Sequence, residues 1–216
     1  MIRSEELSPK AEATRTRVLD TAAGLFWRRN YHGVSLDEVA AQAGVNKATI
    51  YRYYLDKAEL VTAVMAANGE KVIAKVFEPA FAASASPEGR LCAIYQCLYR
   101  AQSSLADKED DVFGCPIAGL ALELGQELPS LRESAREIFD RVESYLLIIA
   151  SDAVAEGKAS GWTDTALART LVQLLHGGFA SSRLSVEPIR MLEAGNASLA
   201  LIGSKRRLSY QTGEIQ

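Results

Sequence analysis

Apolar residues recur at three- and four-residue steps along most of the chain, with polar residues between them. Near the start, Val18, Ala22, Leu25 and Phe26 follow this spacing and predict an amphipathic helix over about residues 11–30. No stretch of the sequence shows sustained two-residue alternation, which is the pattern of a half-buried strand. The predicted fold class is therefore all-α, without a repeat at solenoid spacing.

The second predicted helix is bounded by residues that start and stop helices. The run 35–38 reads SLDE, which is the form of a capping box, and Gly44 suits the left-handed turn that ends a helix. Asn46 is an N-cap residue type and opens a short helix that extends to about residue 54. Helix, glycine turn and helix over residues 35–54 form the outline of a helix-turn-helix.

Longer helices are predicted in the rest of the chain. The first follows a cap signature at Asp56 and is expected to stop near Pro79. A capping box begins at Ser130, and Gly157 is expected to end the helix that it opens. The predicted helices cover about residues 57–77, 91–99, 130–157 and 164–183.

Composition excludes several classes of function. The apolar run Leu146 to Ala150 is far shorter than the roughly 20 residues of a membrane-spanning helix, and the first ten residues lack an apolar signal core. We therefore expect a cytoplasmic protein that has no membrane partner. Three cysteines and two histidines, at their spacings, are too few for a disulfide framework or a zinc site, so neither metal nor cofactor is expected.

The charges are divided unevenly along the chain. The net charge of −3 argues at first against a nucleic-acid partner. Residues 1–57, however, carry nine Lys and Arg against seven Asp and Glu, which leaves 15 against 20 for residues 58–216. A weakly basic head of net charge +2 thus precedes an acidic body of net charge −5.

Residues 18–60 resemble the N-terminal DNA-binding domain of the TetR/AcrR family of transcriptional regulators. The resemblance rests on a first helix ending in Leu25-Phe26, Val34-Ser35 at the start of the second helix, Ala43-Gly44-Val45 in the turn, Thr49-x-Tyr51 in the third helix, and Lys57-x-x-Leu60 after it. It implies a DNA-binding domain over residues 11–71 and an effector-binding and dimerisation domain over residues 72–216. The implied function is that of a ligand-responsive repressor, which binds a palindromic operator in double-stranded DNA as a homodimer and is released by a small organic effector.

The short third helix carries side chains suited to DNA. Lys47 can reach a base acceptor or a phosphate, and the hydroxyl groups on this helix suit phosphate oxygens. The resemblance assigns DNA contacts to Thr49 and Tyr51, the usual histidine position to Tyr53 and a phosphate contact to Lys57. Ala48 stands where the family often has glycine or proline, and Ser35 is expected to contact phosphate as well as to cap its helix. The predicted DNA-binding residues are Ser35, Lys47, Ala48, Thr49, Tyr51, Tyr53 and Lys57.

Two alternatives concern the same segment. The tyrosines can instead form an aromatic core, which is the favoured interpretation for Tyr54, whereas Tyr51 and Tyr53 are assigned to the surface. Asp37 lies on the side expected to face DNA, where its carboxylate would repel phosphate unless it turns away or caps the helix.

The body is predicted to hold a dimer interface and an effector pocket. We expect the helices 130–157 and 164–183 to form a four-helix interface between two copies, with Gly177-Gly178 allowing close backbone approach. The alternative buries both helices within one subunit. The segment FGCPI, residues 113–117, is similar to an element of family subgroups that respond to drugs or flavonoids, which favours an aromatic or electrophilic effector. The predicted pocket residues are Tyr95, Tyr99, Phe113, Cys115 and His176.

Other interpretations of these residues and of the whole chain remain open. Cys115 suits an electrophile sensor if its pKa is lowered, but an inert buried cysteine is the more common case, and His176 can equally be a core residue. An enzyme is disfavoured because the sequence lacks a nucleophile–base arrangement and a nucleotide-binding loop. A helical binding or scaffold protein that does not read DNA is the remaining alternative.

Overall fold

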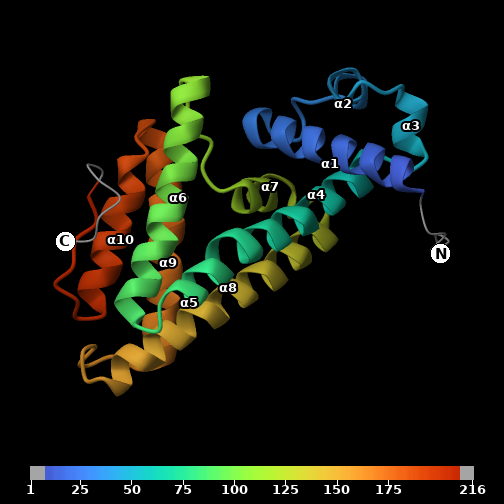
Figure 1. The fold of residues 1–216 in the computed structure, drawn as a ribbon. Helices are drawn as coiled ribbons and strands as arrows, with labels where there is room; N and C mark the ends of the chain where they lie inside the picture. The colour runs from blue at the N-terminus through green and yellow to red at the C-terminus, as the bar shows by residue number, and fades with distance from the viewer. Residues whose placement is uncertain (1–7, 210–216) are drawn as a thin grey trace. The chain divides into compact units, whose positions relative to one another are not determined.

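A computed structural model describes residues 8–209, and within this range all regular structure is helical (Figure 1). The elements are α1 (Pro9–Arg29), α2 (Leu36–Ala43), α3 (Lys47–Tyr51), α4 (Lys57–Val72), the π-helical turn η1 (Ile73–Phe77), α5 (Glu78–Ala83), α6 (Pro87–Glu109), α7 (Pro116–Leu124), α8 (Pro129–Ala155), α9 (Asp164–Ser185) and α10 (Ile189–Leu201). The all-α fold class predicted from the sequence is confirmed. Residues 210–216, at the end of the second expected domain, lie outside the described residues.

The helices form two compact units that do not follow the order of the chain. The first unit contains the described residues up to Asn68 together with Pro116–Ala135. The second unit contains Gly69–Cys115 and the described residues from Arg136 onward. The first border lies near the expected division at residue 71, but α7 belongs with α1 to α3 rather than with the other helices of the body.

Polar side chains cap the helices of the first unit. Ser8, Ser35, Asn46 and Asp56 each accept a hydrogen bond from the backbone N–H three residues further on, at 3.4, 3.2, 2.8 and 2.8 Å. These bonds satisfy amide groups that have no partner inside the helix. The start signals predicted at Ser35, Asn46 and Asp56 are therefore those that the chain uses.

The core of the first unit is small. The four residues whose spacing predicted the first helix, Val18, Ala22, Leu25 and Phe26, are all buried. Buried side chains from the other helices complete this core, among them Val39, Ile50 and Leu60. Because α2 and α3 are only eight and five residues long, they depend on this packing and on their caps rather than on intrinsic helix stability.

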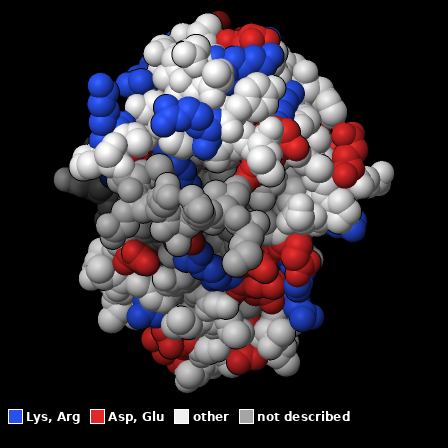
Figure 2. Space-filling view, turned by 90° about the vertical axis from the view of Figure 1, so that its right-hand side faces the viewer, with Lys and Arg blue, Asp and Glu red and all other residues white. Residues whose placement is uncertain are grey.

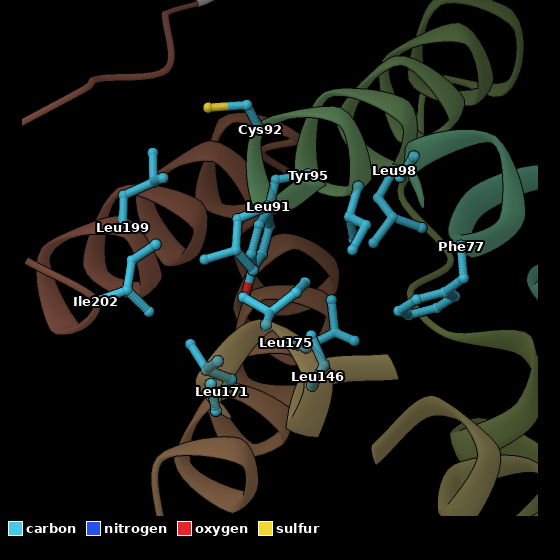
Figure 3. Close-up of a cluster of buried hydrophobic side chains, with 14 of the residues drawn as sticks. Phe77, Leu91, Cys92, Tyr95, Leu98, Leu146, Leu171, Leu175, Leu199 and Ile202 are labelled. Carbon is cyan, nitrogen blue, oxygen red and sulfur yellow. The ribbon is translucent and has the colours of Figure 1, made fainter. Parts of the chain in front are cut away.

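The second unit has a larger core in which α6 packs between other long helices. Figure 3 shows Leu91 and Tyr95 of α6 in the middle of the cluster, with Leu199 and Ile202 on one side and Phe77 on the other. Leu146 of α8 and the α9 residues Leu171 and Leu175 are buried in the same cluster. Burying each such side chain stabilises the unit by roughly 1.5–3 kcal/mol relative to leaving it exposed.

Small residues bring α10 close to its neighbours. A Cβ atom on Gly178 of α9 would lie 2.9 Å from the Cβ atom of Ala194, and one on Gly195 would lie 2.7 Å from Cγ of Tyr95. The close approach expected for the glycine pair thus occurs at Gly178, within one subunit. The Tyr95 and Ser198 hydroxyl groups form a hydrogen bond of 2.8 Å inside this contact.

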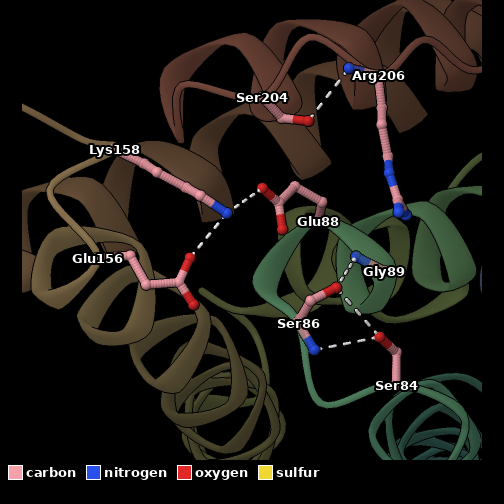
Figure 4. Close-up of polar contacts among 8 residues, drawn as sticks. All are labelled: Ser84, Ser86, Glu88, Gly89, Glu156, Lys158, Ser204 and Arg206. Atoms are coloured by element: carbon pink, nitrogen blue, oxygen red, sulfur yellow. Dashed lines mark hydrogen bonds and ion pairs between the residues drawn. The ribbon is translucent and has the colours of Figure 1, made fainter.

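Polar contacts hold the ends of the second unit's elements (Figure 4). Ser86 caps α6 by accepting the N–H of Gly89 at 3.1 Å. Lys158, which follows α8, lies between the carboxylates of Glu88 and Glu156, at 2.5 and 2.8 Å. The segment after α8 is thereby attached to the start of α6.

Several helix boundaries differ from those predicted. Pro79 does not stop the helix, because it lies in the first turn of α5 after η1, where a missing N–H is tolerated. The helix expected from Ser130 begins one residue earlier at Pro129. Neither α7 nor α10 was predicted. Their start signals are single prolines, Pro116 at the first residue of α7 and Pro188 directly before α10. Both helices contact distant helices, α1 for α7 and α6 and α9 for α10.

Candidate nucleic-acid interface

The turn between α2 and α3 has the geometry that its sequence predicts. Gly44 has φ +63°, in the left-handed region, and its N–H bonds the carbonyl of Ala41 at 3.2 Å. The N–H of Val45 bonds the carbonyl of Ala40 at 2.9 Å. These bonds end α2 and direct the chain into α3 within two residues.

The helix α3 has a buried side and an exposed side. Ile50 is fully buried and Tyr54, just beyond the helix, is 3% exposed, as the core interpretation of Tyr54 predicts. Ala48, Tyr51 and Arg52 are exposed, with Tyr51 at 48%. The large aromatic ring of Tyr51 therefore stands on the outer surface of the helix, where a duplex can reach it.

The cap of α3 includes one of the predicted DNA contacts. Oδ1 of Asn46 accepts hydrogen bonds from both the N–H and the hydroxyl of Thr49, each at 2.8 Å. The Thr49 hydroxyl oxygen keeps its lone pairs for a further donor. The position of this hydroxyl at the start of α3 is thus set by the cap itself.

Lys47 is paired with an acidic residue of α2. Its ammonium group lies 2.8 Å from a carboxylate oxygen of Asp37, and this hydrogen bond raises the pKa of Lys47. Asp37 neither caps α2 nor stands alone, since its charge is offset by Lys47. Both side chains are exposed, so solvent screens this pair and it contributes little to the stability of the unit.

Lys57 and Tyr53 contact groups within the first unit. The Lys57 ammonium donates to the Tyr31 carbonyl at 2.5 Å and lies 3.9 Å above the centre of the Tyr31 ring. Burial lowers the pKa of Lys57, while Glu123 acts in the opposite direction. The Tyr53 hydroxyl donates to the carbonyl of Ala11 at 3.1 Å. Two of the predicted DNA contacts therefore hold helices of the unit together.

Ser35 is exposed, and only its half of the expected capping box is formed. Its hydroxyl oxygen accepts the Glu38 N–H, whereas the Glu38 carboxylate is paired with the guanidinium of Arg29 on α1. The reciprocal bond of a capping box is thus replaced by an ion pair between α1 and α2. The hydroxyl hydrogen of Ser35 remains available to a phosphate oxygen.

Glu123 of α7 was not predicted to matter, yet it binds the end of α1. Its carboxylate accepts the N–H of Tyr31 at 3.0 and 3.1 Å and that of His32 at 3.2 Å. The carboxylate is about 90 residues away in sequence and satisfies amides just beyond the last turn of α1. Sequence patterns do not reveal such a contact, because its two sides share no local spacing.

Lys and Arg side chains lie on the face of the molecule that Figure 2 shows. Figure 2 views the side on which α3 lies and shows Lys and Arg on its upper part, interspersed with uncharged and acidic side chains. No group of three or more His, Cys, Asp or Glu residues in the described range is placed to hold a metal ion. Within the same range, no helix is long and apolar enough to span a bilayer.

The residues predicted to line an effector pocket lie in the second unit but have different neighbours. Tyr95 is buried against α10, and burial raises its pKa to about 12. The His176 ring lies 4.6 Å from the Phe139 ring, and burial lowers the pKa of His176. Phe113 is buried and Cys115 is half-buried. Tyr99, the fifth residue, lines a groove whose lining does not include these four residues.

Tyr99 lines a groove of about 450 Å³ between α6 and the α9–α10 connection. Ser103 and Asp107 of α6 lie along the same wall, and Val186 to Ile189 form the opposite wall. Val186 has φ +55°, a left-handed conformation that is strained for a β-branched residue. A groove beside a strained connection is a candidate ligand site, with Tyr99 as its aromatic side chain.

Comparison with known families decides the identity of the fold. A sequence profile described as "Bacterial regulatory proteins, tetR family" matches residues 18–64. A second profile, "Tetracyclin repressor-like, C-terminal domain", matches residues 90–198, which is about half of the chain. The chain belongs to the TetR family. It is thus a helix-turn-helix DNA-binding transcriptional regulator of a non-enzymatic family, and the predictions of a regulator rather than an enzyme are confirmed.

Individual relatives agree with this family assignment. The TetR-family regulator from Chloroflexus aurantiacus has a solved structure that is 25% identical, with a TM-score of 0.76 over 94% of this chain and 100% of that one. UidR of Escherichia coli, an HTH-type transcriptional regulator, is 25% identical over 35% of this chain and 38% of its own length. The repressor SCO4008 of Streptomyces coelicolor is 41% identical over 25% of this chain and 28% of its own. This chain therefore spans less than half of either curated relative.

Proposed function

We propose that this TetR-family regulator is a repressor that binds a palindromic operator as a homodimer and releases it on binding a small organic effector. The proposed DNA binding rests on the arrangement of α3. Its Ile50 side chain is buried, its Tyr51 side chain is exposed, and Asn46 caps its first turn. The name of SCO4008, a repressor that is 41% identical over 25% of this chain, supports the direction of regulation. A cytoplasmic location follows from the same role.

In this proposal, the base-reading surface consists of side chains at the start and on the outer face of α3. Thr49 and Tyr51 contact base edges and phosphates, Ala48 allows close approach to the groove, and Lys47 exchanges Asp37 for a phosphate. Ser35 donates to a phosphate at the start of α2. Tyr53 and Lys57 act indirectly, because they hold α1 and the Tyr31 carbonyl in place.

The experiment for DNA reading is a mobility shift with the duplex that lies upstream of this chain's own gene. Wild type is expected to retard it, and Tyr51→Ala to weaken binding by about 10-fold or more, which corresponds to about 1.4 kcal/mol. Leu55→Ala is a matched control, because Leu55 is 73% exposed just beyond α3 and has no assigned DNA contact. Equal weakening by the two variants would contradict the assignment of Tyr51.

The dimer interface that we propose uses α9 and α10. A groove of about 640 Å³ runs between these helices and is lined by Gly177 and by Leu184, which is 87% exposed. No described atom lies within 4 Å of a Cβ atom built on Gly177, so another helix can approach there. This proposal keeps the helix 164–183 expected from the sequence and replaces 130–157 by α10 as its partner.

Two charge substitutions distinguish the helix pairs. Ala197→Glu places a carboxylate on the exposed side of α10 in the groove, and Ile148→Glu places one on α8 at a residue that is 47% exposed. We expect the first to reduce the mass measured by light scattering from that of a dimer to that of a monomer. If Ile148→Glu dissociates the dimer and Ala197→Glu does not, the interface formed by the helices 130–157 and 164–183 is supported instead.

The effector site is proposed near the groove of Tyr99, at the buried polar residues Gln102 and Ser182. Oε1 of Gln102 and Oγ of Ser182 have no hydrogen-bond partner among the described residues, although both side chains are at least 98% buried. The Gln102 amide donates to the Gly114 carbonyl at 3.3 Å, and Gly114 lies against Phe179 and Arg183 of α9. Each unpartnered buried group costs about 1–3 kcal/mol, which an effector can recover.

The chemistry of this region favours an effector with a hydrogen-bond donor. An amide oxygen accepts only, so the ligand must supply an N–H or O–H to Gln102. Tyr99, Val186 and Ile189 provide apolar surface in the groove, and Asp107 disfavours an anionic ligand. An aromatic amine or alcohol fits these requirements and agrees with the aromatic effector implied by the family resemblance.

A matched pair of probes tests this site. Phenethylamine is expected to raise the melting temperature of the full chain more than phenylacetate does, because only the amine can donate to Gln102 and pair with Asp107. Gln102→Met preserves the volume, removes the unpartnered oxygen and is expected to reduce the difference between the two probes to the part that Asp107 contributes. Equal stabilisation of wild type by both probes would contradict the proposed effector class.

A further inference from the structure

Several cations of the first unit are occupied by other groups of the same unit. Arg15 pairs with Glu12 at 3.3 Å, and Arg29 pairs with Glu38. Lys57 is held by the Tyr31 carbonyl. These charges contribute little to the field that a DNA duplex experiences, because each is offset by an acid or held partly buried.

Three other cations of this unit have no carboxylate within 4.0 Å among residues 8–209. They are Lys10 and Arg17 on α1 and Arg52 directly after α3, and they come from segments up to 42 residues apart. All three line a single groove of about 680 Å³. The lining of this groove contains no Asp or Glu, so its net formal charge is positive.

The groove is held in shape by two bonds between its walls. Nε of Arg17 donates to the carbonyl of Ala43, the last residue of α2, at 2.8 Å. The Tyr53 hydroxyl donates to the carbonyl of Ala11 at 3.1 Å. The first half of α1 is therefore attached to α2 and to the segment after α3, and the cations need no rearrangement of these helices to face one ligand.

The groove also adjoins the end of α3 that enters DNA. Asn46 and Thr49, which form the cap of α3, belong to its lining. A polyanion in the groove would pass directly beside the side chains assigned to base reading. A run of phosphates is the ligand that matches several fixed cations without an intervening acid.

We propose that Lys10, Arg17 and Arg52 form a phosphate clamp that binds the sugar–phosphate backbone flanking the bases read by α3. This proposal rests on DNA reading by α3 and assigns the main phosphate contacts to residues outside the helix-turn-helix. The clamp sets the depth and angle at which α3 meets the duplex, since α1 and α3 are joined through Tyr53.

The test measures how DNA affinity depends on salt, using fluorescence anisotropy with a labelled mixed-sequence duplex from about 50 to about 200 mM salt. Each lost phosphate contact is expected to reduce the slope of log affinity against log salt by about 0.9. Lys10→Gln and Arg52→Gln should each show this reduction, and the double variant about twice as much. Arg17→Gln should show it with a lower melting temperature, because it also loses the bond to Ala43.

Arg15→Gln is the matched control, since it removes the same charge from the same helix at a paired residue outside the groove. Its slope is expected to stay close to that of wild type. An unchanged slope in both Lys10→Gln and Arg52→Gln, or an equal reduction in Arg15→Gln, overturns the clamp. If wild type fails to bind this mixed-sequence duplex at about 50 mM salt, the clamp is overturned, whereas failure to bind the duplex upstream of the gene contradicts DNA reading, which is a distinct result.

Discussion

The two units of the molecule are held together in different ways. In the first unit, short helices begin at side chains such as Ser35 and Asn46, which bond amides only three residues away. In the second unit, α6 and α9 have 23 and 22 residues and are held by a wide apolar core with close contacts at Gly178 and Gly195. Local bonds define the shape of the DNA-reading part, whereas long-range packing defines the body.

The units also differ in how they use polar groups. In the first unit, Arg17, Tyr53 and Lys57 donate to carbonyls at helix ends and tie helices together. In the second unit, the buried side chains of Gln102 and Ser182 each have an oxygen without a hydrogen-bond partner among residues 8–209. The first unit thus uses these polar groups to join its helices, whereas the second unit leaves two of them for the effector that we propose.

The largest expected effect lies in the core of the second unit. Leu146→Ala removes a side chain that is 2% exposed and should lower the free energy of unfolding by about 2–5 kcal/mol. Ile148→Ala, two residues further along α8 and 47% exposed, should change it by less than about 0.5 kcal/mol. Urea unfolding followed by circular dichroism measures both. Similar losses in the two variants would mean that packing does not dominate this unit.

A smaller effect is expected at the paired glycines of α9. Gly178→Ala forces a methyl group to 2.9 Å from Ala194 and should destabilise the second unit by about 1–3 kcal/mol. Gly177→Ala meets no described atom of its own subunit within 4 Å and, in the Ala197→Glu background that is expected to be monomeric, should stabilise the helix by up to about 1 kcal/mol. Thermal unfolding of the two variants in that background checks this. Destabilisation of the monomer by Gly177→Ala would contradict the expected difference between the two glycines.

Removing the cap of α3 tests whether local hydrogen bonds stabilise the first unit. Asn46→Ala removes the acceptor for two bonds from Thr49 and should cost about 1 kcal/mol of stability. Asn46→Asp retains a capping oxygen and should leave the melting temperature close to that of wild type. Because α3 is only five residues long, loss of the cap should also weaken DNA binding. A stable Asn46→Ala variant would show that packing of Ile50 alone suffices.

The smallest effect is a dependence of stability on pH that arises in the second unit. Burial lowers the pKa of His176 below its ordinary value of 6.5, so the unfolded chain binds a proton more readily than the folded one. The contribution of the neutral ring is complete above that value and is lost as the pH falls through the folded pKa. His176→Phe keeps an aromatic ring against Phe139 and should therefore lose less stability than wild type on acidification. Melting temperatures between about pH 7 and about pH 5 measure the difference, and parallel losses would refute it.

The interface could be predicted from the sequence to different extents at different residues. Ser35, Gly44 and Asn46 were predicted with their roles, because caps and left-handed turns depend on residues within one helical turn. The inward contacts of Tyr53 and Lys57 were not predicted, since their partners Ala11 and Tyr31 lie 42 and 26 residues away. The clamp cations were missed for the same reason, as only the folded unit places Lys10 and Arg17 beside Arg52.

The structure of the second unit was less predictable from the sequence than that of the first unit. Apolar spacing located the helices 130–157 and 164–183 to within two residues at each end. It did not reveal α10, whose apolar side is defined by Tyr95 and Gly178 on other helices. Of the expected pocket residues, Tyr99 lines a groove whereas Tyr95 packs against α10, and apolar spacing does not reveal this difference because it does not determine which helix a side chain faces.

The sequence by itself determined the all-α class, the helix-turn-helix over residues 35–54 and membership of a regulator family, because short-range backbone chemistry and motif spacing encode them. Only the tertiary structure decided which polar groups are occupied and which remain available. Hydrogen bonds and ion pairs join residues that are neighbours in space. The pairing of Lys47 with Asp37, the bonds from Tyr31 and His32 to Glu123, and the shared groove of Lys10 and Arg52 therefore emerge only after the helices pack.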